Sequence, residues 1–327
     1  MKTVLVTGAN GLLASNIIAE LLAKGYSVKG LLRNCNNFQL KAHPNLELAQ
    51  GDIVDKECIK NALKDCSCVI HVAAITEQSL LHYSDYSSVN VDATEALIRA
   101  AAINEIETFV YVSSANTFGY GLNENRENET IEMKAPFTKS HYAKSKFEGQ
   151  QIALSYKDKM KVVVVNPTFM LGTYDSKPSS GEIILMGYKK KIIFYPSGGK
   201  NFVHVQDAAK GTVNAMKFGK SGESYILANE NLSYKSFFQK LSTTTYNNPI
   251  YIMIPKYLLL LIGLFGSIIR KLGIKTSISL TNMRILCINN FYNNHKAKRD
   301  LKLRFQSTEK AISDSLDWFV EREIIAK

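Results

Sequence analysis

A tyrosine and a lysine stand four positions apart in the segment SHYAKSK, residues 140–146. The two side chains, Tyr142 and Lys146, would share one face of a helix, because residues four apart are neighbours on a helix surface. A tyrosine with a pKa of about 10 is a poor base at neutral pH, and a nearby lysine ammonium favours its phenolate. Such a pair can exchange a proton with a carbonyl or an alcohol. Tyr292 and Lys296 have the same spacing, so the elements around each pair must decide between them.

Short apolar runs alternate with helical patterns in the first half of the chain. Strands are predicted over residues 3–7, 27–32, 46–49, 68–72, 108–113 and 161–166, and helices over 12–24, 55–64, 89–104 and 140–157. Runs that are apolar throughout are typical of parallel strands covered on both faces. The alternation therefore predicts an α/β fold with a doubly wound parallel sheet.

The pattern changes after Pro167, where loop-rich stretches separate irregularly spaced elements. Helices are predicted over residues 234–241, 255–272, 276–287 and 308–323. We expect a dinucleotide-binding domain over residues 1–167, to which segments near 192–215 return. Residues 168–327 are then expected to form a smaller, helix-rich substrate domain.

The segment VLVTGANGLLAS follows the first strand and opens the first helix. Gly8 can form the sharp turn, Gly11 allows a pyrophosphate to come close to the backbone, and Ala14 is small enough for close packing of helix on strand. The N–H groups at the start of a helix attract negative charge. The sequence therefore predicts dinucleotide binding at this turn, by Gly8 and Gly11 together with Asn10, Leu12 and Leu13.

The end of the second strand indicates which dinucleotide is bound. An acidic residue that would hold a ribose 2′-hydroxyl is absent there, and Arg33 stands in its place. Because a guanidinium can bind a 2′-phosphate through its fork of donors, NADP(H) is predicted over NAD(H), which stays possible. Asp52, followed by Ile53, is placed to bind the adenine, although a helix N-cap is an alternative role for Asp52.

Ligands bind at the carboxyl ends of parallel strands in such sheets. The fourth strand ends at Ala73 and Ala74, which leave room for a flat ring, and the fifth ends at Ser113 and Ser114. Pro167 forms a rigid wall at the end of the sixth. Tyr142 and Lys146 begin the helix between strands five and six, so their face can point toward this edge of the sheet. No such surroundings are predicted for Tyr292 and Lys296, whose spacing we interpret as coincidence.

Eight segments in this order resemble the extended short-chain dehydrogenase/reductase superfamily: TGANGLLA, GDIVD, HVAA, NVDAT, VSSAN, YAKSK, NPT and FVHVQDAA. The resemblance covers essentially the whole chain and implies a Rossmann-type fold. It also implies that Ser114, Tyr142 and Lys146 form a catalytic triad, with Ser114 holding the substrate oxygen. By the same resemblance Asn90 supports the cofactor site, and Asp207, His71 and His204 are structural. Further expected contacts are Thr76 with cofactor and substrate, and Asn116, Thr117, Phe169 and Met170 with substrate.

Three functions are compatible with that superfamily. The acid pair typical of sugar-nucleotide dehydratases is replaced by Ala115, Asn116 and Thr117, and the arginine with which epimerases hold a diphosphate is replaced by Lys200 and Asn201. The segments GYSVKGLLRN and NPTFMLGTYDSKPSSGEII resemble dihydroflavonol 4-reductase and the 3β-hydroxysteroid dehydrogenases. We therefore expect an oxidoreductase that reduces a ketone or aldehyde of a small apolar substrate, or oxidises the alcohol. A nucleotide-sugar epimerase with tightly bound NAD and a non-catalytic NADP-sensing protein are the alternatives.

The charge and the cysteine and histidine content indicate which partners the protein binds. The net charge of +11 comes from residues spread along the chain, and no basic and aromatic motif indicates nucleic-acid binding. Cys66 and Cys68 lie two apart, but no second pair of cysteines and no pair of histidines has zinc-like spacing. The N-terminus has no room for a signal peptide, so a cytoplasmic protein without metal is predicted.

The most apolar stretch runs from Tyr257 to Ile269 and is shorter than the roughly 20 residues that span a membrane. It could pack inside the protein, line an apolar pocket or lie on a membrane as a peripheral contact. A homodimer through the helices around the fifth strand is expected by analogy.

Overall fold

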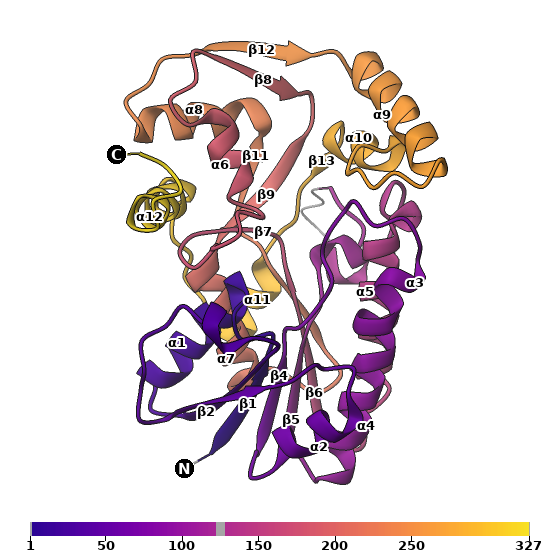
Figure 1. Cartoon of the computed structure of the whole chain (residues 1–327), viewed down its shortest axis with the longest axis vertical. Coiled ribbons are helices and arrows are strands. Elements are labelled where there is room, and N and C mark those ends of the chain that lie inside the picture. Colours follow the sequence, from indigo (N-terminus) through magenta and orange to yellow (C-terminus); the bar gives the residue numbers. More distant parts are fainter. Residues whose placement is uncertain (1, 122–127, 327) are drawn as a thin grey trace.

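Seven parallel strands form the central sheet, in the order β10–β6–β5–β4–β1–β2–β3 (Figure 1). The structure is a computed structural model that describes residues 2–121 and 128–326. The strands are β1 (Thr3–Thr7), β2 (Ser27–Leu32), β3 (Leu46–Gln50), β4 (Cys68–His71), β5 (Thr108–Val112), β6 (Lys161–Pro167) and β10 (Ser224–Leu227). Both β1 and β2 have the bounds that the sequence predicts, and the Rossmann-type doubly wound architecture is confirmed.

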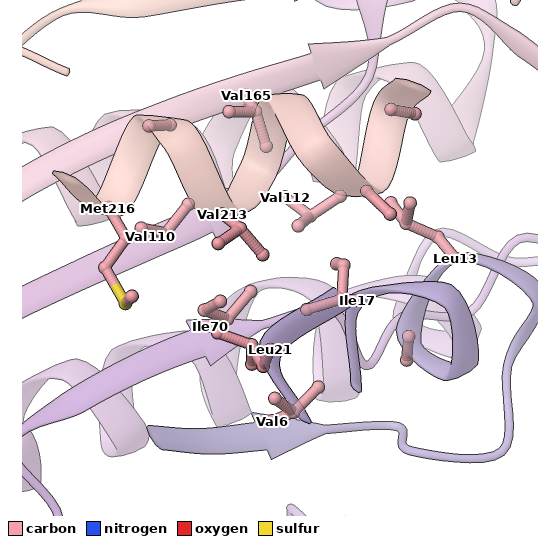
Figure 2. Close-up of a cluster of buried hydrophobic side chains, with 14 of the residues drawn as sticks. Val6, Leu13, Ile17, Leu21, Ile70, Val110, Val112, Val165, Val213 and Met216 are labelled. Atoms are coloured by element: carbon pink, nitrogen blue, oxygen red, sulfur yellow. The ribbon is translucent and has the colours of Figure 1, made fainter. Parts of the chain in front are cut away.

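Helices cover both faces of this sheet because each strand buries its alternate side chains on opposite sides. One face packs on α1 (Leu12–Ala23) and α7 (Val205–Phe218), through residues such as Val6, Ile17 and Val213 (Figure 2). The other face packs on α2 (Lys56–Leu63), α4 (Thr94–Ile103) and α5 (His141–Leu154). The short helix α11 (His295–Leu301) lies against α7.

The helix predicted over residues 89–104 is not uniform. A short helix α3 (Ser84–Ser87) leads into a π-helical stretch, Ser88–Ala93, before α4 begins at Thr94. Such wider turns occur frequently at functional sites. Asn90, in the middle of the stretch, is fully buried and bonds to two other segments of the chain.

After β6 the chain builds a second part with its own core around Phe202, Phe237 and Trp318. It contains strands as well as the predicted helices: β7 (Phe169–Leu171), β9 (Gly199–His204), β11 (Glu230–Ser233) and β13 (Asn289–Asn290) form one sheet, and β8 (Ile192–Pro196) pairs with β12 (Ile250–Ile254). Its helices are α6 (Glu182–Gly187), α8 (Tyr234–Thr244), α9 (Lys256–Lys271), α10 (Leu280–Leu286) and α12 (Thr308–Glu321).

The predicted return to the central sheet and the helix predicted over residues 276–287 both begin later in the structure. The return to the central sheet consists of α7 and β10 and begins at Val205, whereas β8 and β9, within the predicted segment 192–215, belong to the second part. The helix predicted over residues 276–287 is shorter, because Ser279 caps α10 by accepting a hydrogen bond from the backbone N–H of Asn282 at 3.1 Å.

Candidate active site

The turn between β1 and α1 has the geometry of a phosphate-binding site. Gly8 has φ +67°, and a Cβ there would lie 2.9 Å from the Cα of Ala73, so only glycine fits. Gly11 is the N-cap of α1; no described side chain caps this helix start, and its first turn carries no acidic residue. The N–H groups at Leu12 and Leu13 therefore stay available to a negatively charged group. The turn lies where the strand order reverses between β1 and β4, which is where such sheets bind nucleotides.

The residues predicted to hold the rest of the dinucleotide follow the neighbouring strands. Arg33 is exposed directly after β2, and Asp52 is half-buried after β3, beside the buried Ile53. Asp55 is the residue that caps α2, accepting a hydrogen bond from the N–H of Glu57 at 2.9 Å. The alternative role of Asp52 as the cap of α2 therefore does not hold; its Oδ1 accepts a hydrogen bond from the N–H of Val54 at 3.2 Å. Asn10, Ala73 and Ala74 are half-buried around the same turn.

Tyr142 and Ser114 meet at the carboxyl end of β5. The helix that carries Tyr142 starts at Ser140, whose hydroxyl accepts a hydrogen bond from the N–H of Ala143 at 3.3 Å. Tyr142 is half-buried, and Ser114 is buried as the last residue before a 3₁₀ turn. Burial raises the pKa of Tyr142, and a hydrogen bond with Ser114 opposes that shift. Tyr142 is therefore protonated at neutral pH and can donate its proton.

Lys146 lies one helical turn beyond Tyr142 and is 2% exposed. Its Nζ stands 4.3 Å from the centre of the Tyr111 ring, which offers a cation–π contact. Burial lowers the pKa of Lys146 to about 7, so its charge changes near neutral pH. His71 is fully buried, and burial together with the charge of Lys146 lowers its pKa to about 3. The neutral His71 ring bonds to Thr7 and Thr94 and is structural.

Replacing Lys146 with Met is expected to raise the free energy of unfolding at pH 7 by about 1–3 kcal/mol, because it removes a buried cation. The unfolded lysine keeps its proton up to pH 10.5, whereas the folded one loses it above about 7. The contribution of Lys146 to wild-type stability therefore becomes less favourable as the pH drops from 10.5 toward 7, and it is constant below that. Denaturant titrations at pH 7 and about pH 9 measure the free energy of unfolding of both proteins. The difference between variant and wild type should be smaller at the higher pH. An equal difference in the free energy of unfolding at both pH values would contradict the lowered pKa of Lys146.

Asn90 ties the loop after β4 to helix α5. Its Oδ1 accepts a hydrogen bond from the N–H of Ile75 at 2.8 Å, and its Nδ2 donates to the carbonyl of Ile75 at 3.0 Å and to the hydroxyl of Ser145 at 2.9 Å. A Cβ at Gly149 would overlap the carbonyl of Asn90, so glycine allows this close packing. Asn90 is fully buried, and these bonds fit the supporting role expected for it, while its contact with the cofactor stays a prediction.

A cavity of about 430 Å³ opens beside Tyr142. Its walls come from the loop after β4, from the start of α5, from the last turns of α9 and from the segment that leads into α10, including Leu80, His82, His141 and Arg270. Arg270 donates hydrogen bonds to the carbonyls of Gln78, Ser79 and Leu80, and so holds that loop against α9. Sequence reasoning missed these residues, because nothing in the spacing of α9 indicates that its last turn reaches a loop 190 residues earlier.

None of the predicted substrate residues is among those that line this cavity. Thr117 is fully buried, and its hydroxyl bonds to the carbonyl of Ser114 and to Gln150, so its predicted contact with substrate is corrected to a structural one. Phe169 packs edge-on against Phe202, and Met170 against the core under α1 and α7. Thr76 is exposed on the loop after β4, Asn116 accepts a hydrogen bond from Asn290, and Pro167 is buried at the end of β6.

The second tyrosine–lysine pair lies away from the cavity. Tyr292 precedes α11, so it does not share a helical face with Lys296, which pairs with Glu223 at 2.7 Å. His204 bonds to Asp314, and Asp207 accepts hydrogen bonds from Gln306, which fixes the segment before α12. Within residues 2–121 and 128–326, no three His, Cys, Asp or Glu side chains gather as a metal site would require.

The fold and the turn at Gly8 define a nucleotide-binding enzyme of the short-chain dehydrogenase/reductase type. The chain belongs to the NAD dependent epimerase/dehydratase family, whose model matches residues 4–228. Membership makes it an NAD(P)-dependent enzyme of the oxidoreductase, dehydratase or epimerase kind.

Two relatives and one solved structure match nearly the whole chain. The "Putative dihydroflavonol 4-reductase" of Synechocystis sp. is 28% identical over 96% of this chain and 93% of its own. Sterol demethylase protein B of Methylococcus capsulatus is 27% identical over 99% of this chain and 100% of its own. The crystal structure of gox2253 is 28% identical, with a TM-score of 0.84 over 98% of both chains.

Proposed function

We propose that the protein is an NADP(H)-dependent reductase of a ketone or aldehyde, acting through Ser114, Tyr142 and Lys146. The observation that carries the proposal is the pairing of a protonated Tyr142 with Ser114 at the carboxyl edge of the sheet, where Tyr142 also lines the cavity. The likeness to a dihydroflavonol 4-reductase and a sterol demethylase protein supports a carbonyl or alcohol of an apolar molecule as substrate.

Each of the three side chains has a separate task in this reaction. The reduced nicotinamide, when bound, supplies a hydride to the carbonyl carbon. Ser114 donates a hydrogen bond to the carbonyl oxygen as negative charge develops there. Tyr142 gives its phenolic proton to the same oxygen, which completes the alcohol. The ammonium form of Lys146, on the same helical face, favours the phenolate that remains, and the lysine can also hold the cofactor ribose.

The residues at the nucleotide end fit a dinucleotide. Gly8 leaves space that a Cβ would fill, and the uncapped start of α1 offers its N–H groups to a pyrophosphate. Asp52 would bind the adenine, while Ala73 and Ala74 would border the nicotinamide side. Arg33, exposed after β2, would pair with a 2′-phosphate, which supports NADP(H) over NAD(H).

Arg33→Ala is expected to raise the Kd for NADPH roughly tenfold to a hundredfold, because a charge-assisted pair with the phosphate is lost. The Kd for NADH, which has no 2′-phosphate, should stay unchanged. Fluorescence titration with both cofactors measures the two constants. Arg304→Ala, at another exposed arginine, serves as the control. Tighter binding of NADH than NADPH by the wild-type protein would reject the role of Arg33.

A second candidate, a nucleotide-sugar epimerase, is favoured by one observation at Lys200. Burial lowers the pKa of Lys200 to about 8, its Nζ lies 4.1 Å from the centre of the Phe169 ring, and no ion pair with it occurs in the described part of the chain. A diphosphate could supply the missing partner. Against it, Asn201 is bonded to Thr168 and Asn231, and the sequence has Lys200 and Asn201 where epimerases have an arginine.

Steady-state assays separate the candidates. The wild-type protein is incubated with NADPH and a panel of apolar ketones and aldehydes, and the loss of NADPH absorbance is followed. The proposal requires NADPH to be consumed in step with alcohol formation. Interconversion of UDP-sugars without net consumption of cofactor would establish the epimerase instead. Cofactor binding without turnover of either substrate class would favour the NADP-sensing protein.

A further inference from the structure

Helix α9 presents an apolar face to the outside of the molecule. Tyr257, Leu261, Leu264, Phe265 and Ile268 are each exposed over 49% to 70% of their area. Side chains of this size rarely gather on the surface of a soluble protein without a partner. The opposite face of α9 packs against the rest of the protein.

The inner face of α9 fits α10 and the loop before it through small residues. A Cβ at Gly263 would lie 2.8 Å from the side chain of Met283, and one at Gly266 would overlap the backbone of Ile278. Ser267 accepts a hydrogen bond from the N–H of Leu280 at 2.8 Å. The helix is therefore held in place by these small residues and by the buried Leu259, while most of its other large apolar residues face outward.

The apolar face continues onto the two-stranded sheet of β8 and β12. In this sheet Ile192 lies opposite Ile250, and Phe194 opposite Ile252, and all four side chains are exposed. Two residues between them point inward: Ile193 is buried, and Tyr251 bonds to Ser242 of α8. β12 leads directly into α9, and both lie at the end of the molecule farthest from the N-terminus (Figure 1). We call the exposed side chains of α9, β8 and β12 the outer apolar surface.

Only positive charges border this surface along the sequence. Lys189, Lys190 and Lys191 precede β8, Lys256 starts α9, and Lys275 follows it, all exposed. Between Glu230 and Asp300 the chain has no acidic residue. A two-fold contact with a second copy would bring these lysines together, since the same patch meets itself. Anionic lipid headgroups complement them.

We propose that the outer apolar surface docks on an anionic lipid bilayer, with α9 lying in the plane of the headgroups. In the described ranges no helix is long and apolar enough to cross a membrane, and the exposed face of α9 matches a helix that rests in the interface. Ser267 and Arg270, on another side of α9, line the cavity beside Tyr142. Docking would therefore bring that cavity near the lipid surface, where an apolar substrate dissolves.

Co-sedimentation of the full-length protein with vesicles tests the docking. One vesicle type contains phosphatidylcholine alone, and the other contains phosphatidylcholine with phosphatidylglycerol. We expect binding to the anionic vesicles that weakens with added salt, because salt screens the lysines. The double variant Leu261→Asp/Phe265→Asp should lower this binding at least tenfold, and Lys256→Glu/Lys275→Glu should lower it on the anionic vesicles.

Ile103→Asp provides the matched control. Ile103 is 73% exposed at the end of α4, outside the outer apolar surface, so its replacement should leave vesicle binding unchanged. Unchanged NADPH binding by all variants shows that they are folded.

Absence of wild-type binding to anionic vesicles, or equal binding by Leu261→Asp/Phe265→Asp, would overturn the proposal. A wild-type dimer that this variant dissociates, without vesicle binding, would assign the surface to a second copy. Docking does not depend on the reaction, so vesicle binding by a protein without reductase activity rejects only the proposed function.

Discussion

Tyr142→Phe should lower kcat for carbonyl reduction by about 100- to 10,000-fold, which is the range that a positioned proton donor contributes. The variant keeps the aromatic ring and loses only the hydroxyl that pairs with Ser114. Because the hydroxyl does not contribute to the turn at Gly8, the Kd for NADPH should stay within about twofold of the wild-type value. Steady-state kinetics with a reducible ketone and a fluorescence titration measure the two quantities.

Tyr292→Phe is the matched control for this experiment. Tyr292 stands four residues before a lysine, as Tyr142 does, but its hydroxyl is buried and has no hydrogen-bond partner among the described atoms. Removing that hydroxyl should leave kcat unchanged. Equal activity of Tyr142→Phe and the wild-type protein would show that another group donates the proton.

Gly8→Ala should lower the free energy of unfolding by about 2–5 kcal/mol and weaken NADPH binding. The added Cβ would lie 2.9 Å from the Cα of Ala73, so the backbone of β1 or of the loop after β4 must move. The left-handed conformation costs a residue with a Cβ about 1–2 kcal/mol, and overpacking adds about 1–3. Urea denaturation measures the stability, and titration with NADPH measures the affinity.

Gly25→Ala separates the two contributions to this loss. Gly25 also has a positive φ, +79°, but a Cβ there would meet no atom within 4 Å. Its replacement should cost only the backbone strain of about 1–2 kcal/mol and leave cofactor affinity intact. If both alanine variants lost the same stability and bound NADPH equally well, the close approach of Gly8 to Ala73 would have no importance for the site.

The sheet could be predicted from the sequence because its strands are short, apolar throughout and separated by helical patterns. β1 and β2 have the predicted bounds, and the glycine turn lies where it was expected. The pairing of β8 with β12 could not be predicted, since it joins segments far apart in sequence and neither carries a turn signal. The apolar pattern of residues 257–269 predicts a helix, which α9 confirms, but the pattern does not say which side faces the protein.

In the site too, local sequence spacing predicts some features, and others depend on contacts between distant segments. The spacing of Tyr142 and Lys146 indicates a shared helical face, and the strand order brings Ser114 beside them. Spacing could not show that Thr117 points inward, because its burial depends on Asn166 and Gln150 from two other elements. The cavity wall at Arg270 depends equally on tertiary contacts.

Transfer of deuterium from NADPH that carries deuterium at both C4 positions of the nicotinamide tests the central claim most directly. The wild-type protein is incubated with the labelled cofactor and a ketone that it consumes, and the alcohol is analysed by mass spectrometry. Reduction with Tyr142 as proton donor predicts a single deuterium on the carbinol carbon and one NADPH oxidised for each alcohol formed. Product without the label, or turnover that leaves the amount of NADPH unchanged, would contradict the assignment of the protein as a carbonyl reductase.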